Sequence, residues 1–311
     1  MPSNYTELNN EALLQISGPD SLQFLQGQTT CDTRKVSPEQ AIPGAFCTPK
    51  GRVVCDFILC QIRDNHYALR LRRDILEASA TTFSKYIIFS KAELNQNDTN
   101  WKIYGCWGSE IKPALYSVLG VQDSAEDASG IPYSSCCGEG FAIVQIDQAG
   151  TQFECYIDTE NRADLAVQLE EGLCASDQSL WEALQIEQGI GRIEAATSGD
   201  YIPQMLNYDL TGHISFDKGC YTGQEVVARM HYRGKPKKRL YRASSTEIQT
   251  LHAGAALYSS SSSQSVGSIV NCAIDETGQA VALIVAPVES DTRSLHLGDP
   301  AGPLVTYLST G

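Results

Sequence analysis

The pattern of apolar segments changes near residue 235, and this change constrains the fold more than any other feature of the sequence. Before it, strand-like runs such as 53–62 alternate with helical stretches such as 160–171. After it, the apolar runs are short strands separated by turns. Mixed elements followed by strands alone are typical of an α+β region and a small β-barrel or sandwich. We therefore expect an α+β region over 1–235 and a β-barrel domain over 236–311.

The α+β region is expected to hold two interleaved subdomains, with approximate divisions near 45–100 and near 175. Residues 101–171 predict a strand, a helix, two strands and a helix, the order of a ferredoxin-like unit. Near the start of the chain, Asp20 is a good N-cap for a short helix, and Gly27 is expected to end that helix.

Composition limits the class of protein. Apolar residues make up 42% of the 311 residues, enough for a packed core, and no run is long enough to span a membrane. No leader peptide is visible, so we expect a cytoplasmic protein. The eleven cysteines contain no Cys-x-x-Cys spacing, and their odd number favours reduced thiols over disulfides. We therefore expect no resident metal or Fe–S cluster.

Charge is distributed unevenly along an acidic chain. The net charge is −14, which argues against a general nucleic-acid coat. The segment 218–239 nevertheless holds seven basic residues and one acidic residue, a net charge of +6, so the rest of the chain carries −20. Three interpretations are open for this basic segment: a contact for the glutamate tail of a folate, a contact for RNA, or a solvated linker between domains.

The segment 218–225, Lys-Gly-Cys-Tyr-Thr-Gly-Gln-Glu, carries the most distinctive chemistry. It follows a long loop and precedes a helix expected to begin at Gly223. A lysine two residues before Cys220 and a helix N-terminus behind it both favour the thiolate form of this cysteine. The alternative is a glycine-punctuated turn around a half-buried cysteine.

Four stretches of the chain together resemble the YgfZ-type folate-binding proteins, relatives of the glycine-cleavage T-protein (aminomethyltransferase). The first is the segment 218–229, KGCYTGQEVVAR, which is closely similar to the signature of that family. The second, Tyr-Ile-Pro-Gln at 201–204 with Asn207 after it, precedes the signature as in the family. The others are Gly-Gln-Thr-Thr-Cys-Asp at 27–32 and Thr-Pro-Lys-Gly-Arg at 48–52.

The resemblance implies a T-protein-like fold, in which ferredoxin-like α+β subdomains form a ring around a folate channel. It also implies tetrahydrofolate, or a derivative, as cofactor. Glu187 matches the glutamate that holds the pterin in the aminomethyltransferases, although Gln185 replaces the family's arginine. The residues expected to bind the cofactor are Glu187, Lys218, Gly219, Tyr221, Gly223, Gln224, Glu225, Arg229, Gln28, Asp32, Gln204 and Asn207.

Two residues are candidates for chemistry. Cys220 of the signature would act as a redox group or transient ligand. Asp56 stands where the aminomethyltransferases carry a pair of aspartates, and only one of that pair is present here. An aspartate facing folate would move a proton or stabilise a cation during one-carbon transfer. A strand aspartate facing solvent is the alternative for Asp56.

Three functions follow from the resemblance as hypotheses. The first is a folate-binding accessory protein that supports Fe–S cluster assembly or repair, with Fe–S client or assembly proteins as partners. The second is a tetrahydrofolate-dependent aminomethyl (one-carbon) transferase that uses Asp56; whether the chain is an enzyme stays open. The third is a folate-linked tRNA-modification factor that binds tRNA through the basic segment.

Overall fold

The computed structural model describes residues 3–97, 100–121, 131–245, 251–288 and 294–308. The chain divides into two compact units, each built from two stretches of sequence. The first unit comprises Met1–Gly44 and Phe57–Gln178, and the second comprises Ala45–Asp56 and Ser179–Gly311. The domain boundaries expected from the sequence stay a prediction. In the described part of the chain, no helix is long and apolar enough to cross a membrane.

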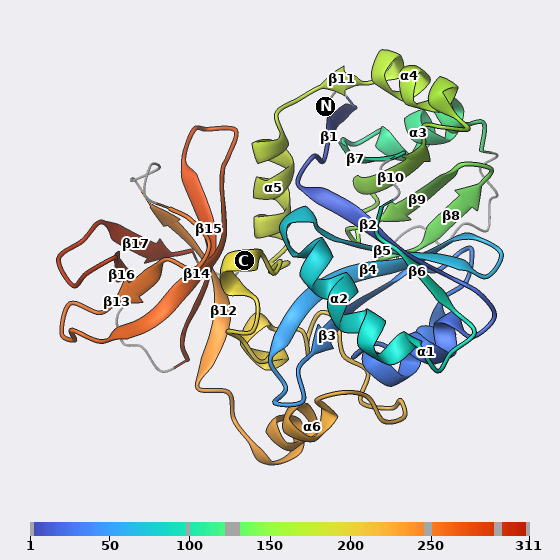
Figure 1. Ribbon diagram of the computed structural model, residues 1–311. Coiled ribbons are helices and arrows are strands. Elements are labelled where there is room, and N and C mark those ends of the chain that lie inside the picture. Colours follow the sequence, from blue (N-terminus) through green and yellow to red (C-terminus); the bar gives the residue numbers. More distant parts are fainter. Residues whose placement is uncertain (1–2, 98–99, 122–130, 246–250, 289–293, 309–311) are drawn as a thin grey trace. The chain divides into compact units, whose positions relative to one another are not determined.

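The first unit contains a six-stranded sheet. Its strands are β1 (Asn4–Glu7), β7 (Trp101–Trp107), β8 (Ser135–Gly138), β9 (Phe141–Gln145), β10 (Gln152–Asp158) and β11 (Cys174–Ala175), in the order β11-β1-β7-β10-β9-β8. Helices α3 (Ile111–Leu119) and α4 (Ala163–Gly172) cover it (Figure 1). The ferredoxin-like order expected over 101–171 is present, with β8 as an additional strand that the sequence pattern did not predict.

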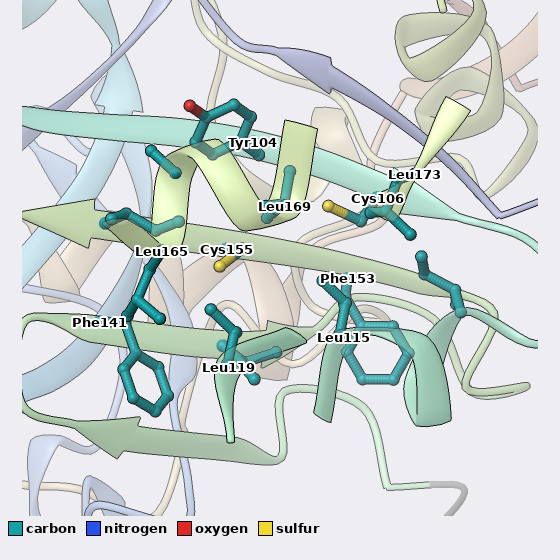
Figure 2. Close-up of a cluster of buried hydrophobic side chains, with 14 residues drawn as sticks. Tyr104, Cys106, Leu115, Leu119, Phe141, Phe153, Cys155, Leu165, Leu169 and Leu173 are labelled. Carbon is teal, nitrogen blue, oxygen red and sulfur yellow. The ribbon is translucent and has the colours of Figure 1, made fainter. Parts of the chain in front are cut away.

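The core of this layer is apolar and buried. Leu115 and Leu119 of α3 and Leu165 and Leu169 of α4 pack against sheet residues such as Phe153. Figure 2 shows these side chains gathered between the helices and the strands. The apolar positions of each helix recur at intervals of four, so each helix presents one continuous apolar stripe to the sheet.

A second sheet has five strands. They are β2 (Glu11–Ser17), β3 (Ile42–Cys47), β4 (Val53–Arg63), β5 (His66–Arg72) and β6 (Glu93–Asn95), in the order β3-β4-β5-β2-β6. Its helical segments are α1 (Ser21–Gln28), η1 (Thr33–Lys35), η2 (Arg73–Ile75) and α2 (Leu76–Ile87). The boundary between the two units falls within β3 and β4, so the turn that joins these strands belongs to the second unit.

Helix α1 differs from the sequence-based expectation at both ends. Asp20 occupies the N-cap position, but its side chain makes no cap hydrogen bond. Its Oδ2 atom instead accepts a hydrogen bond from the backbone N–H of Lys91, at 2.8 Å. The helix also continues through Gly27 to Gln28, since this glycine does not adopt the left-handed conformation that ends many helices.

The second unit contains a closed β-barrel together with short helical segments. The helical segments are α5 (Gln178–Glu187), η3 (Ala195–Thr197), η4 (Pro203–Leu206) and α6 (Gln224–Arg233). The barrel strands are β12 (Lys238–Ser245), β13 (Ala256–Tyr258), β14 (Ser265–Ile274), β15 (Ala280–Pro287), β16 (Ser294–Leu297) and β17 (Leu304–Tyr307), in the order β12-β15-β14-β13-β16-β17 (Figure 1, orange to red). The α+β class and the C-terminal barrel are therefore confirmed.

Candidate functional site

The segment 218–225 forms a tight loop that leads directly into helix α6. The backbone N–H of Tyr221 donates to Oε1 of Gln224 at 3.2 Å, and the backbone N–H of Gln224 donates to the carbonyl of Tyr221 at 3.2 Å. Gly223 is the N-cap residue, with φ at +85°, a conformation that other residues adopt only with strain. The loop therefore has its own internal hydrogen bonds. Helix α6 begins at Gln224, one residue after the expected start at Gly223.

This loop and helix α6 pack against the turn between β3 and β4. A Cβ atom on Gly223 would collide with the backbone carbonyl oxygen of Thr48. A Cβ atom on Gly51, which has φ at +69°, would lie 2.8 Å from Cβ of Val226. Both contacts require glycine, because any side chain would force the two backbones apart. The sequence stretches 48–52 and 218–226 are thus packed closely together in one site.

Within this site Cys220 is exposed and Tyr221 is half-buried. Burial, with a smaller contribution from the neighbouring Cys47, raises the pKa of the Tyr221 phenol. The ammonium group of Lys218 lies 5.0 Å from the centroid of the Tyr221 ring, a cation–π contact. All eleven cysteines of the chain are free thiols, and Cys220 and Cys174 are its two exposed ones. The geometry therefore presents one thiol to solvent from a fixed loop.

Gln204 and Asn207 hold the neighbouring segments in place. The Nε2 atom of Gln204 donates to the carbonyl of Val227 in α6 at 2.8 Å, and Nδ2 of Asn207 donates to the carbonyl of Leu240 in β12 at 3.0 Å. Arg239 donates to the Gln204 carbonyl at 3.0 Å and forms an ion pair with Asp209, with contacts of 2.6 and 2.9 Å. Arg239 is therefore neutralised, and the basic segment presents fewer free charges than its sequence suggests.

Asp56 lies on β4 and is buried, with 2% of its surface exposed. Its carboxylate accepts a hydrogen bond from Nε of Arg192 at 2.5 Å and another from the backbone N–H of Ile193 at 2.6 Å. The Arg192 side chain is only 9% exposed, so both members of this ion pair are buried. Arg192 was not predicted from the sequence, because its partner is 136 residues away and no local pattern joins the two.

Glu187 lies at the end of α5 and lines a pocket. The pocket has a volume of about 340 Å³, and its lining residues are Glu187, Gln188, Gly189, Asn207, Leu240, Tyr241, Arg242 and Leu283. Glu187 is exposed, and its backbone carbonyl accepts a hydrogen bond from Arg242 at 3.2 Å. This volume falls in the range of small-molecule sites. The pocket brings together the predicted residues Glu187 and Asn207, and adds Tyr241 and Arg242, which no sequence pattern indicated.

The remaining predicted residues occupy other positions. Glu225 and Arg229 are exposed on α6, and Gly219 is exposed in the loop. Gln28 and Asp32 belong to the first unit, at the end of α1 and at the N-cap of η1. Asp32 forms an ion pair with Arg34, and this hydrogen-bonded pairing lowers the pKa of Asp32 to about 2. The carboxylate of Asp32 is therefore charged at neutral pH.

Similarity to known proteins agrees with this arrangement. No protein-family model matches the chain. The "tRNA-modifying protein YgfZ" of Klebsiella pneumoniae is 35% identical over 260 residues, which cover 82% of this chain and 75% of that protein. The protein of the same name from Photorhabdus laumondii is 34% identical, with 78% of this chain and 70% of that protein covered.

A solved structure shows the same fold at low sequence identity. The glycine cleavage system aminomethyltransferase T from Bartonella henselae superposes with a TM-score of 0.77 over 99% of this chain and 85% of that chain, at 13% identity. This match confirms the expected T-protein-like fold. The sequence identity to the relatives, over most of both chains, shows the family as well. The chain therefore belongs to the family of the tRNA-modifying protein YgfZ.

Proposed function

We propose that this chain is a tetrahydrofolate-binding accessory protein that supports assembly or repair of Fe–S clusters in client enzymes. The observation that carries the proposal is the exposed thiol of Cys220 on a loop fixed by Gly223 and by the turn at Thr48. An exposed thiol is accessible to a partner protein for transient ligation or redox exchange. One thiolate cannot hold a cluster alone, so contact with a cluster would be shared with a partner protein.

The pocket at Glu187 has the chemistry for a pterin. Its carboxylate is exposed and able to accept two N–H groups from the pterin edge, a charge-assisted pairing. Tyr241 supplies an aromatic wall, and Arg242 supplies a cation for a carboxylate of the ligand. Bound folate would supply one-carbon chemistry, and the chain's own residues would bind and orient it.

Replacing Glu187 by glutamine is expected to weaken tetrahydrofolate binding by about tenfold or more, because a charge-assisted pair becomes a neutral one. Titration calorimetry on the purified chain measures this change. Glu276→Gln is the matched control, since Glu276 is an exposed glutamate of the same unit that does not line the pocket. Equal weakening in both variants, or none in either, would remove Glu187 from the proposed site.

The accessory role itself is tested in cells that lack the gene. We expect reduced activity of folate-dependent or radical-type Fe–S enzymes in these cells, with recovery when the wild-type gene is returned. The protein is proposed to act in the cytoplasm, where thiols stay reduced. Unchanged activity of Fe–S enzymes in cells that lack the gene would contradict the accessory role.

Transfer of a one-carbon group is the second candidate for this fold. It requires Asp56 to contact folate, whereas Asp56 is buried against Arg192.

The third candidate is a folate-linked role in tRNA modification. Its support is the name of the relatives, together with the exposed cations Arg229 and Arg233 of α6. Binding of tRNA that falls steeply with added salt is expected from that role.

A further inference from the structure

Three aromatic rings form a cluster at the surface of helix α6. The rings of Phe216 and His231 are stacked, with centroids 3.7 Å apart and planes inclined by 17°. The ring of Tyr232 stands edge-on to both, at 4.8 Å from His231 and 6.3 Å from Phe216. His231 is exposed, and 69% of the Tyr232 surface is exposed. Phe216 is half-buried beneath His231, and the exposed rings of His231 and Tyr232 offer faces for another planar group.

Cations border this aromatic cluster. Tyr232 and Arg233 are successive residues of α6, and Arg229 lies one helical turn before them, on the face opposite the buried Val227. Exposed Lys235 and Lys237 follow the helix. In the part of the chain that the structure describes, no carboxylate forms an ion pair with any of these four cations, in contrast to Arg239.

Exposed rings and unpaired cations together match one class of ligand. Single-stranded nucleic acids bind through bases stacked on aromatic side chains and through phosphates held by basic groups. A duplex keeps its bases stacked inside, so it would use the cations and leave the rings without a partner. An acidic protein segment would also use the cations alone.

We propose that the surface formed by Phe216, His231, Tyr232, Arg233, Lys235 and Lys237 binds single-stranded RNA. Tyr232 and His231 stack on bases, and Arg233 and Lys237 contact phosphates. The choice of RNA over DNA rests on the third candidate function, a role in tRNA modification, whereas the stacked rings and the cations are observed in the structure. This surface is distinct from the residues that line the Glu187 pocket.

The test is fluorescence anisotropy of a labelled single-stranded RNA 12-mer titrated with the full chain. Tyr232→Ala is expected to weaken binding by at least fivefold, because one base would have no ring to stack on. Arg233→Gln with Lys237→Gln should lower the slope of log affinity against log salt by about 1.4, or about 0.7 for each phosphate that is no longer neutralised. Both variants change exposed residues, and circular dichroism checks that they fold.

Tyr86→Ala serves as the matched control, because Tyr86 is an exposed aromatic residue of α2 beside the exposed Lys85. It should bind the RNA as the wild type does. Wild-type affinity in Tyr232→Ala, or full displacement of the RNA by polyglutamate or by duplex RNA at equal charge, would overturn the proposal. Equal affinity for single-stranded DNA would overturn the choice of RNA. Tetrahydrofolate titrations of the same preparations report separately on the folate proposal.

Discussion

Asp56→Ala is expected to lower the free energy of unfolding by about 3–5 kcal/mol, because Arg192 would stay buried without its carboxylate. The hydrogen bond to the backbone N–H of Ile193 would disappear as well. A change of this size corresponds to a decrease in melting temperature on the order of 10 °C. Thermal unfolding followed by circular dichroism measures it.

A matched control is available on the surface of the chain. Asp164→Ala breaks an ion pair with Arg162 in which the Asp164 side chain is 53% exposed, so its melting temperature should stay near that of the wild type. An unchanged melting temperature of Asp56→Ala together with loss of one-carbon transfer would contradict this account. The aspartate would then be catalytic, and the buried ion pair would not contribute to stability. Recovery of stability in the double variant Asp56→Leu with Arg192→Leu would support the ion-pair account.

Gly223→Ala is expected to lower the free energy of unfolding by about 2–4 kcal/mol, from left-handed backbone strain and from the collision of its Cβ atom with Thr48. The same change should release the Cys220 loop from the turn at Thr48. Limited proteolysis at the loop and thermal unfolding measure the two effects.

Gly219→Ala provides the control within the same loop. Gly219 has no positive φ, and a Cβ atom there would meet nothing within 4 Å. Its substitution should change stability by no more than about 0.5 kcal/mol. Equal effects at Gly219 and Gly223 would show that the loop responds to any added side chain and would contradict the specific packing of Gly223 on the turn.

Elements with a strong local pattern could be predicted from the sequence. The helices α3, α4 and α5 follow apolar positions spaced for one helical face, and the barrel strands β14 and β15 are long apolar runs bounded by turns. The short strand β16 was not predicted, because its four residues carry too few apolar positions to form a pattern. Its existence is decided by pairing with β13 and β17.

Contacts between residues that lie far apart in the sequence could not be predicted. Asp20 was expected to cap a helix, but its carboxylate instead accepts a hydrogen bond from the backbone N–H of Lys91, 71 residues away. The sequence indicates one more cation in the basic segment at Arg239, whereas in the structure this residue forms an ion pair with Asp209. The signature segment could be found from its residues, whereas the turn that anchors it lies about 170 residues earlier in the chain. No local sequence pattern indicates which of these distant residues contact each other in the fold.

The most direct test of the central claim compares the two exposed thiols. Cells lacking the gene receive wild type, Cys220→Ala or Cys174→Ala, and the activity of an Fe–S enzyme is measured alongside the amount of each protein. Both cysteines are exposed, so neither substitution should affect folding. The account predicts that wild type and Cys174→Ala restore the activity and that Cys220→Ala does not. Full restoration by Cys220→Ala at equal protein levels would contradict it.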